Sequence, residues 1–174
     1  MGWSYTHREP GMADRAWFRH EWGSRIRILD SATVNSTFYA ACEHENEPGK
    51  VWAAVVLVKR CHGYHNFGWK DMGEEMGPCE SKCPERILNR LTETESPFAL
   101  QWRERCREYA RNKKFLRRLK VGQTVKLLNP MTFGTEAAQY LTKASLPRRK
   151  NIYMTERGNY VRFSNLADYP FEQA

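Results

Sequence analysis

A lysine and several acidic residues lie close together in the segment 68–78, whose sequence is Gly-Trp-Lys-Asp-Met-Gly-Glu-Glu-Met-Gly-Pro. Lys70 stands beside Asp71, and Glu74 follows three positions later. A lysine and acids held in a partly buried loop can act as proton donor and acceptor, so these residues are the candidate catalytic groups. The alternative is an Ω-like loop that folds on itself, pairs the lysine with an acid and buries its methionines. The second interpretation is favoured, because the sequence holds no phosphate-binding glycine loop, nucleophile elbow or Ser/His/Asp set. Whether the chain is an enzyme stays open, with the balance against it.

Thiol and imidazole groups form a second candidate site in the same part of the chain. Four of them, Cys61, His65, Cys79 and Cys83, fall within 23 positions and could close a tetrahedral zinc site. Their spacing does not match two regular zinc knuckles, because a C-H-x2-H segment would have to combine with a C-x3-C pair. The five cysteines are also an odd number, which is typical of free thiols. Free cysteines are therefore favoured over structural zinc, and no cofactor is expected.

The third candidate site is basic and rests on a predicted helix over residues 97–119. Ser96 followed by Pro97 is a helix-start signal, and apolar residues then recur at helical spacing. The remaining faces carry guanidinium and ammonium groups that could reach successive phosphates. The candidate contacts are Arg103, Arg107, Arg111, Lys114, Arg117 and Arg118 in the helix, with Arg148, Arg149 and Lys150 in a later loop. The alternative is that many of them pair with acids of the first half of the chain.

The charge is strongly segregated along the sequence. Residues 1–96 hold 12 Lys and Arg against 14 Asp and Glu, whereas residues 97–174 hold 16 against 6. The second half therefore carries a net charge of +10, although the whole chain carries +8. Such a field attracts polyanions and accelerates encounters with them, but it does not identify the polyanion. DNA or RNA is the leading candidate partner, and an acidic surface of a protein complex is the other.

The elements that must position these groups indicate an α+β fold. Residues 25–30, 37–43 and 51–60 read as strands of an antiparallel sheet with flanking helices, and residues 61–84 read as a long ordered loop. Short strands follow residue 122, which suggests a small SH3-like β-barrel. The expected divisions are an α+β domain at 1–95, a basic connecting helix at 96–120 and the barrel at 121–174. No apolar run approaches the roughly 18 residues of a membrane span, and the first residues lack a signal segment. No membrane partner and a cytoplasmic location are therefore expected.

Several segments resemble an uncharacterised domain family of phage- and plasmid-borne bacterial proteins. They are Met1-Gly2-Trp3, the strand from Ser36 to Ala41, the run from Val51 through Gly68 to Pro78 with Cys83-Pro84, and the segment from Trp102-Arg103 to Gly122. The resemblance spans nearly the whole chain and implies no activity, but it implies an accessory protein of a mobile element in a bacterial host cell. Cys79 and the paired histidines are not part of the family pattern.

The positive charge of the second half and the resemblance together predict a nucleic-acid-associated accessory protein of a phage or mobile element. In one version it is a counter-defence inhibitor of the anti-CRISPR or anti-restriction type that acts on a nucleoprotein complex. A small enzyme with its site in the 61–84 loop and a purely protein-binding inhibitor are the alternatives.

Overall fold

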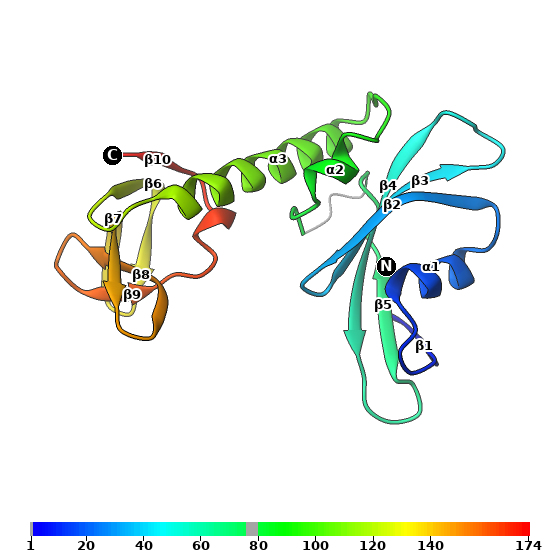
Figure 1. Ribbon diagram of the computed structural model, residues 1–174, viewed down its shortest axis with the longest axis horizontal. Coiled ribbons are helices and arrows are strands. Elements are labelled where there is room, and N and C mark those ends of the chain that lie inside the picture. The colour runs from blue at the N-terminus through cyan, green and yellow to red at the C-terminus, as the bar shows by residue number, and fades with distance from the viewer. Residues whose placement is uncertain (1, 76–79) are drawn as a thin grey trace. The chain divides into compact units, whose positions relative to one another are not determined.

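The chain divides into two compact units, Met1–Glu108 and Tyr109–Ala174. The computed structural model describes residues 2–75 and 80–174 (Figure 1). The boundary between the units falls inside helix α3 (Pro97–Arg118), so the helix expected as a separate connecting segment contributes one part to each unit. Each unit is built around one five-stranded antiparallel sheet.

The sheet of the N-terminal unit has the strand order β1-β5-β4-β3-β2. Its strands are β1 (Ser4–Thr6), β2 (Ile26–Val34), β3 (Thr37–His44), β4 (Val51–Arg60) and β5 (Phe67–Asp71). All neighbouring strands are antiparallel, which confirms the predicted meander. The expectation of an irregular segment over 61–84 is wrong for β5, which pairs with β4 on one side and β1 on the other.

Both faces of this sheet are covered, and residues therefore alternate between two cores along each central strand. One face packs Phe38 and Cys42 against helix α1 (Asp14–Trp22), which contributes Trp17 and Phe18. The opposite face packs Tyr39 against Trp102 of α3 and against the short helix α2 (Glu85–Leu88). In Figure 1, α1 lies on one side of the sheet and α2 on the other. Because water reaches neither face, β3 is buried along almost its whole length.

Helix α3 begins and ends as its sequence predicts. The Oγ atom of Ser96 accepts the backbone N–H of Ala99 at 3.5 Å, which caps the first turn. Trp102 is fully buried, and its Nε1 donates to the backbone carbonyl of Glu80 at 3.0 Å. Arg117 and Arg118 occupy the last turn, where cations complement the helix dipole.

The C-terminal unit contains a sheet with the order β10-β6-β7-β8-β9. Its strands are β6 (Thr124–Phe133), β7 (Glu136–Leu146), β8 (Arg149–Thr155), β9 (Tyr160–Arg162) and β10 (Phe171–Gln173). Among residues 109–174, β9 and β10 are the sheet edges and do not pair with each other, so the expected closed SH3-like barrel is not found. The chain between them instead folds over the sheet through the 3-10 helix η1 (Leu166–Asp168), and Leu166 joins the core with Phe163 and Leu141.

Within residues 2–75 and 80–174, no helix contains an apolar stretch long enough to cross a membrane.

Candidate functional site

A groove of about 370 Å³ lies in the C-terminal unit, between the last turns of α3 and the strands β7 and β8. We call it the basic groove and define it by six of its lining residues, Tyr109, Lys113, Arg117, Lys143, Asn151 and Tyr153. Apolar side chains from the core of the unit complete the walls. Three of the lining residues are cationic and none is acidic, so the groove is suited to an anionic ligand.

Lys143 is the cation that the sheet places within the groove. The register of β7 and β8 sets Lys143 directly opposite Tyr153, and its Nζ lies 4.6 Å from the centre of the tyrosine ring. The lysine is half-buried, and burial lowers its pKa. No carboxylate of the described residues forms an ion pair with it. A bound anion would supply the counter-charge that the unit itself does not provide.

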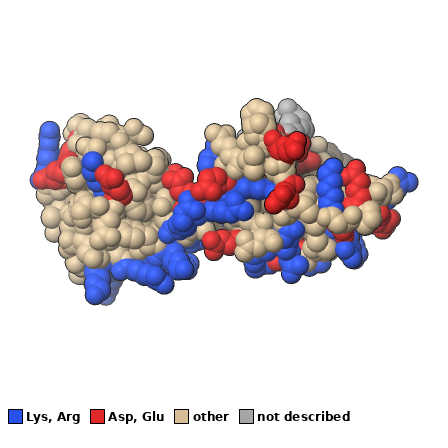
Figure 2. Space-filling view, turned by 90° about the horizontal axis from the view of Figure 1, so that it is seen from above, with Lys and Arg blue, Asp and Glu red and all other residues tan. Residues whose placement is uncertain are grey.

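Helix α3 supplies the two other cations of the groove. Lys113 and Arg117 are four residues apart and therefore lie on one face of the helix. Lys113 places its Nζ 5.5 Å from the ring centre of Tyr109, and Arg117 is exposed. Neither forms an ion pair within the described part of the chain. Figure 2 shows Lys and Arg side chains gathered along one margin of the C-terminal unit.

The hairpin between β7 and β8 carries a second group of exposed cations, Arg148, Arg149 and Lys150. Arg148 has a φ of 59° and Asn151 a φ of 55°, both in the left-handed region. Asparagine tolerates this conformation, but for arginine it costs about 1 kcal/mol relative to glycine. The strained arginine places a guanidinium group at the hairpin tip, close in sequence to Asn151 of the groove.

The predicted phosphate contacts of α3 do not all face solvent. Arg111, Lys114, Arg117 and Arg118 are exposed, and Arg107 is half-exposed. The prediction of a phosphate contact is wrong for Arg103, because this residue is only 6% exposed. Its Nε and Nη2 donate to the Glu74 carboxylate at 2.6 and 2.8 Å, and its Nη1 donates to the carbonyl of Thr92 at 2.6 Å. All three nitrogens of the Arg103 guanidinium thus donate hydrogen bonds inside the N-terminal unit, and the group is buried away from phosphates.

The three candidate catalytic residues are not brought together as one proton-transfer set. Lys70 and Asp71 are adjacent in β5, and strand alternation directs their side chains to opposite faces of the sheet. Glu74 is buried in the ion pair with Arg103, and its Oε1 also accepts the backbone N–H of Ala53 at 3.0 Å. The Glu74 carboxylate is therefore engaged by Arg103 and Ala53 and does not form a set with Lys70 and Asp71.

The candidate zinc ligands have separate surroundings. Cys83 is buried in the core beside α2, whereas Cys61 is half-buried at the end of β4 and His65 is exposed. Cys79 lies outside the described residues. Within residues 2–75 and 80–174, no group of three or more His, Cys, Asp or Glu side chains is arranged to hold a metal ion.

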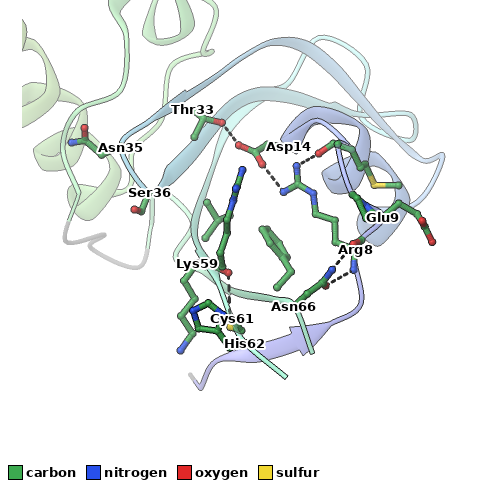
Figure 3. Close-up of a pocket in the computed structure, with 16 residues that line it drawn as sticks. Arg8, Glu9, Asp14, Thr33, Asn35, Ser36, Lys59, Cys61, His62 and Asn66 are labelled. Carbon is green, nitrogen blue, oxygen red and sulfur yellow. Dashed lines mark hydrogen bonds and ion pairs between the residues drawn. The ribbon is translucent and has the colours of Figure 1, made fainter. Parts of the chain in front are cut away.

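A larger cavity, of about 810 Å³, lies in the N-terminal unit and includes Cys61 and His62 from the predicted loop (Figure 3). One ion pair and several hydrogen bonds connect residues that line it. The Nη1 of Arg8 lies 2.6 Å from Oδ1 of Asp14, and Thr33 donates to the same carboxylate. Asn66 bonds the backbone of Arg8 twice, at 2.8 and 2.7 Å. These contacts hold the N-terminal segment on the sheet, and the lining of this cavity mixes acids, Glu9 and Asp14, with its cations, unlike that of the basic groove.

Sequence reasoning missed Lys143 and Tyr153. The strand that contains Lys143 was expected, but the lysine was not singled out. The signal that could have identified it is alternation, because Leu141 and Lys143 are two residues apart on one strand and Leu141 is a core residue. A lysine at an inward-facing strand position must lie in a groove or have a buried partner.

Residues 93–166 match a family described as "Domain of unknown function (DUF6927)". This match is narrower than the resemblance expected from the sequence, which extends over nearly the whole chain. The matched segment contains every named residue of the basic groove and the β7–β8 hairpin. Neither the curated proteins nor the solved structures contain a match to the chain.

Proposed function

We propose that the C-terminal unit binds the phosphate backbone of nucleic acid through the basic groove and the β7–β8 hairpin. The observation that carries this proposal is the set of three groove cations, Lys113, Arg117 and Lys143, in a lining without acidic side chains. The unit as a whole has 13 Lys and Arg against 4 Asp and Glu. A phosphate group is the anion that a nucleic acid presents repeatedly at this kind of surface.

Recognition of this kind is independent of base sequence. Tyr153 is only 2% exposed, and Lys143 lies over its ring, so the tyrosine does not offer a free face to a base. Tyr109 lies beside Lys113, whose Nζ is 5.5 Å from the ring centre. The other named groups of the groove are cations and an amide, which suit phosphate and sugar oxygens and carry no base code. Affinity should therefore depend on salt concentration much more than on sequence.

The wider role that we propose is that of an accessory protein which acts on nucleic acid or on a nucleoprotein complex, without catalysis. Its support is the segregation of charge, because a strongly basic unit can occupy a path that a polyanion would otherwise follow. In a mobile element, such occupancy would serve counter-defence.

The experiment is a titration of a fluorescently labelled oligonucleotide with the full chain, followed by anisotropy between about 50 and 200 mM salt. Lys143→Met removes the charge and keeps the side-chain length. Lys126→Met is the matched control, because Lys126 lies in the same sheet but pairs with Glu172 at 3.0 Å. We expect Lys143→Met to weaken binding and to reduce the slope of log affinity against log salt by about 1, with a smaller effect for the control.

Two results would overturn the proposal. One is binding that does not weaken with salt, or that weakens equally in the two variants. The other is equally tight binding of polyglutamate of matched charge, which would indicate an acidic protein partner rather than nucleic acid.

A further inference from the structure

A second hollow, of about 440 Å³, lies in the N-terminal unit. Strand β1, the end of α1 and strand β5, which Figure 1 shows together near the N-terminus, provide its lining. The lining residues, which define the indole hollow, are Gly2, Ser4, Glu21, Trp22, Trp69 and Asp71. The hollow is distinct from the cavity at Arg8, with which it shares no lining residue.

Two tryptophan rings form an aromatic corner in this hollow. The ring centres of Trp22 and Trp69 are 4.8 Å apart, and their planes meet at 56°. Trp17, which is buried, supports both rings from behind, with its ring centre 5.7 Å from each of them. The two indoles are thus fixed at an angle to each other and remain partly open to solvent. Both indoles line the hollow, and the negative face of an indole ring attracts cations.

The charges that line the hollow are all negative. Glu21 and Asp71 contribute carboxylates, and no lysine or arginine lines it. Asp71 accepts the backbone N–H of Gly73 at 3.1 Å, and no Lys or Arg of the described residues forms an ion pair with it. Burial raises the pKa of Asp71, and no positive charge contributes to lowering it. The nearest partner of Glu21 is His20, whose Nδ1 lies 3.8 Å from Oε1.

The backbone adds to this negative potential. Glu21 and Trp22 are the last two residues of α1, a helix of nine residues, whose C-terminal carbonyl groups carry a partial negative charge. Two carboxylates, a helix C-terminus and two indole rings therefore line one volume, and this combination favours a cation.

The chemistry of the lining selects an organic cation over a metal ion. Ca²⁺ and Mg²⁺ require several oxygen ligands, whereas half of this lining is aromatic or glycine. A methylated ammonium group has a diffuse charge and an apolar surface, which match an indole face and a nearby carboxylate. We infer that the indole hollow binds a methylated ammonium group, such as a choline head group or a methylated lysine side chain. This inference concerns the N-terminal unit and does not depend on nucleic-acid binding.

The test compares choline with 3,3-dimethylbutan-1-ol, its neutral isostere, in titrations of the full chain followed by NMR of the indole N–H groups. We expect choline to bind in about the millimolar range and the neutral isostere to bind at least about tenfold more weakly. Asp71→Asn should weaken choline binding by about fivefold, because it keeps the acceptor for Gly73 but removes the charge. Glu75→Gln is the matched control, since Glu75 is exposed and does not line the hollow.

Equal binding of choline and the isostere would overturn the inference, because it would show that shape and not charge is recognised. Absence of any choline-dependent shift of the Trp22 and Trp69 signals would overturn it as well. If Asp71→Asn weakened choline binding no more than Glu75→Gln did, the inferred role of Asp71 would be wrong. Glu21→Gln supplies a second variant whose substituted side chain is partly exposed and whose fold is not at risk.

Discussion

The ion pair between Arg103 and Glu74 should be a main determinant of the stability of the N-terminal unit. Both side chains are buried, at 8% and 6% exposure, and they join α3 to the segment that follows β5. The perturbation is Glu74→Gln, which keeps the shape of the side chain and removes its charge. It leaves the Arg103 guanidinium buried without a counter-charge.

The magnitude follows from the number of contacts and from their burial. The carboxylate receives two hydrogen bonds from Arg103 and one from the backbone of Ala53, and one Arg103 donor remains bound to Thr92. Removing one partner of a buried, hydrogen-bonded ion pair costs about 3–5 kcal/mol. Small domains have a total free energy of unfolding of about 5–15 kcal/mol, so the variant should lose a large part of its stability. With an m-value of about 2 kcal/mol/M, the urea midpoint should fall by about 2 M.

Tryptophan fluorescence is a selective assay for this change, because all six tryptophans of the chain lie between residues 3 and 102. Urea unfolding followed in this way reports on the N-terminal unit and not on the C-terminal one. The control is Glu75→Gln, at the exposed neighbouring position, which should change the free energy of unfolding by no more than about 0.5 kcal/mol. A midpoint for Glu74→Gln that equals the control midpoint would refute the reasoning.

A double variant separates burial of charge from loss of packing. Arg103→Leu with Glu74→Leu removes both charges and should be more stable than either single leucine variant, because no buried charge is left without its partner. Strict additivity of the two single effects would contradict the existence of a direct pair.

Two further predictions concern buried ionisable groups. The pKa of Asp71 is above its ordinary value in the folded state, so its ionisation lowers the stability of the fold above that pKa. At acid pH the group is protonated in both the folded and the unfolded state, and the loss of stability disappears. Asp71→Asn should therefore raise the melting temperature at pH about 7 but not near pH about 3, and a gain that persists unchanged at acid pH would contradict this prediction. Burial raises the pKa of the Cys42 and Cys106 thiols to about 12 and also raises that of Cys83. Iodoacetamide should therefore modify the half-buried Cys61 before these three at neutral pH, which mass spectrometry of digests would show. Equal labelling rates of the four thiols in the folded chain would contradict this prediction.

Local signals predicted the elements that rest on local interactions. Helix α3 was identified by Ser96-Pro97 and by the recurrence of apolar residues, and the central strands were identified by their composition and the turns between them. Strand β5 was not identified, because the sequence around Gly68 and Lys70 has neither a run of apolar residues nor β-branched ones. Its strand conformation comes from pairing on both sides, with β4 and with β1, which lies more than sixty positions earlier in the chain.

The assignment of Arg103 to the exposed set shows where reasoning from residue type fails. Ala99, Trp102, Arg103 and Cys106 are the buried residues of α3, and they follow the spacing i, i+3, i+4 and i+7 of one helix face. Position 103 therefore belongs to the buried stripe by periodicity, although an arginine occupies it. The partner that makes this burial tolerable, Glu74, is 29 residues away, and no local pattern announces it.

The acids of the C-terminal unit are too few to neutralise its cations. Residues 109–174 contain four acidic residues, so one-to-one pairing would still leave nine of the 13 Lys and Arg without a carboxylate of their own unit. At least two of the four acids also have other roles: Glu136 accepts the side-chain amide of Asn159 at 2.6 Å, and Glu156 accepts the backbone N–H of Gln139 at 3.3 Å. Most of the positive charge of this unit must therefore be balanced from outside it, by carboxylates elsewhere in the chain, by small counterions in solution or by a polyanion. A polyanion releases its own condensed counterions when it binds. Replacement of the small counterions of this unit by a polyanion is therefore favourable at low salt. This is the physical reason to expect the salt dependence on which the proposed function rests.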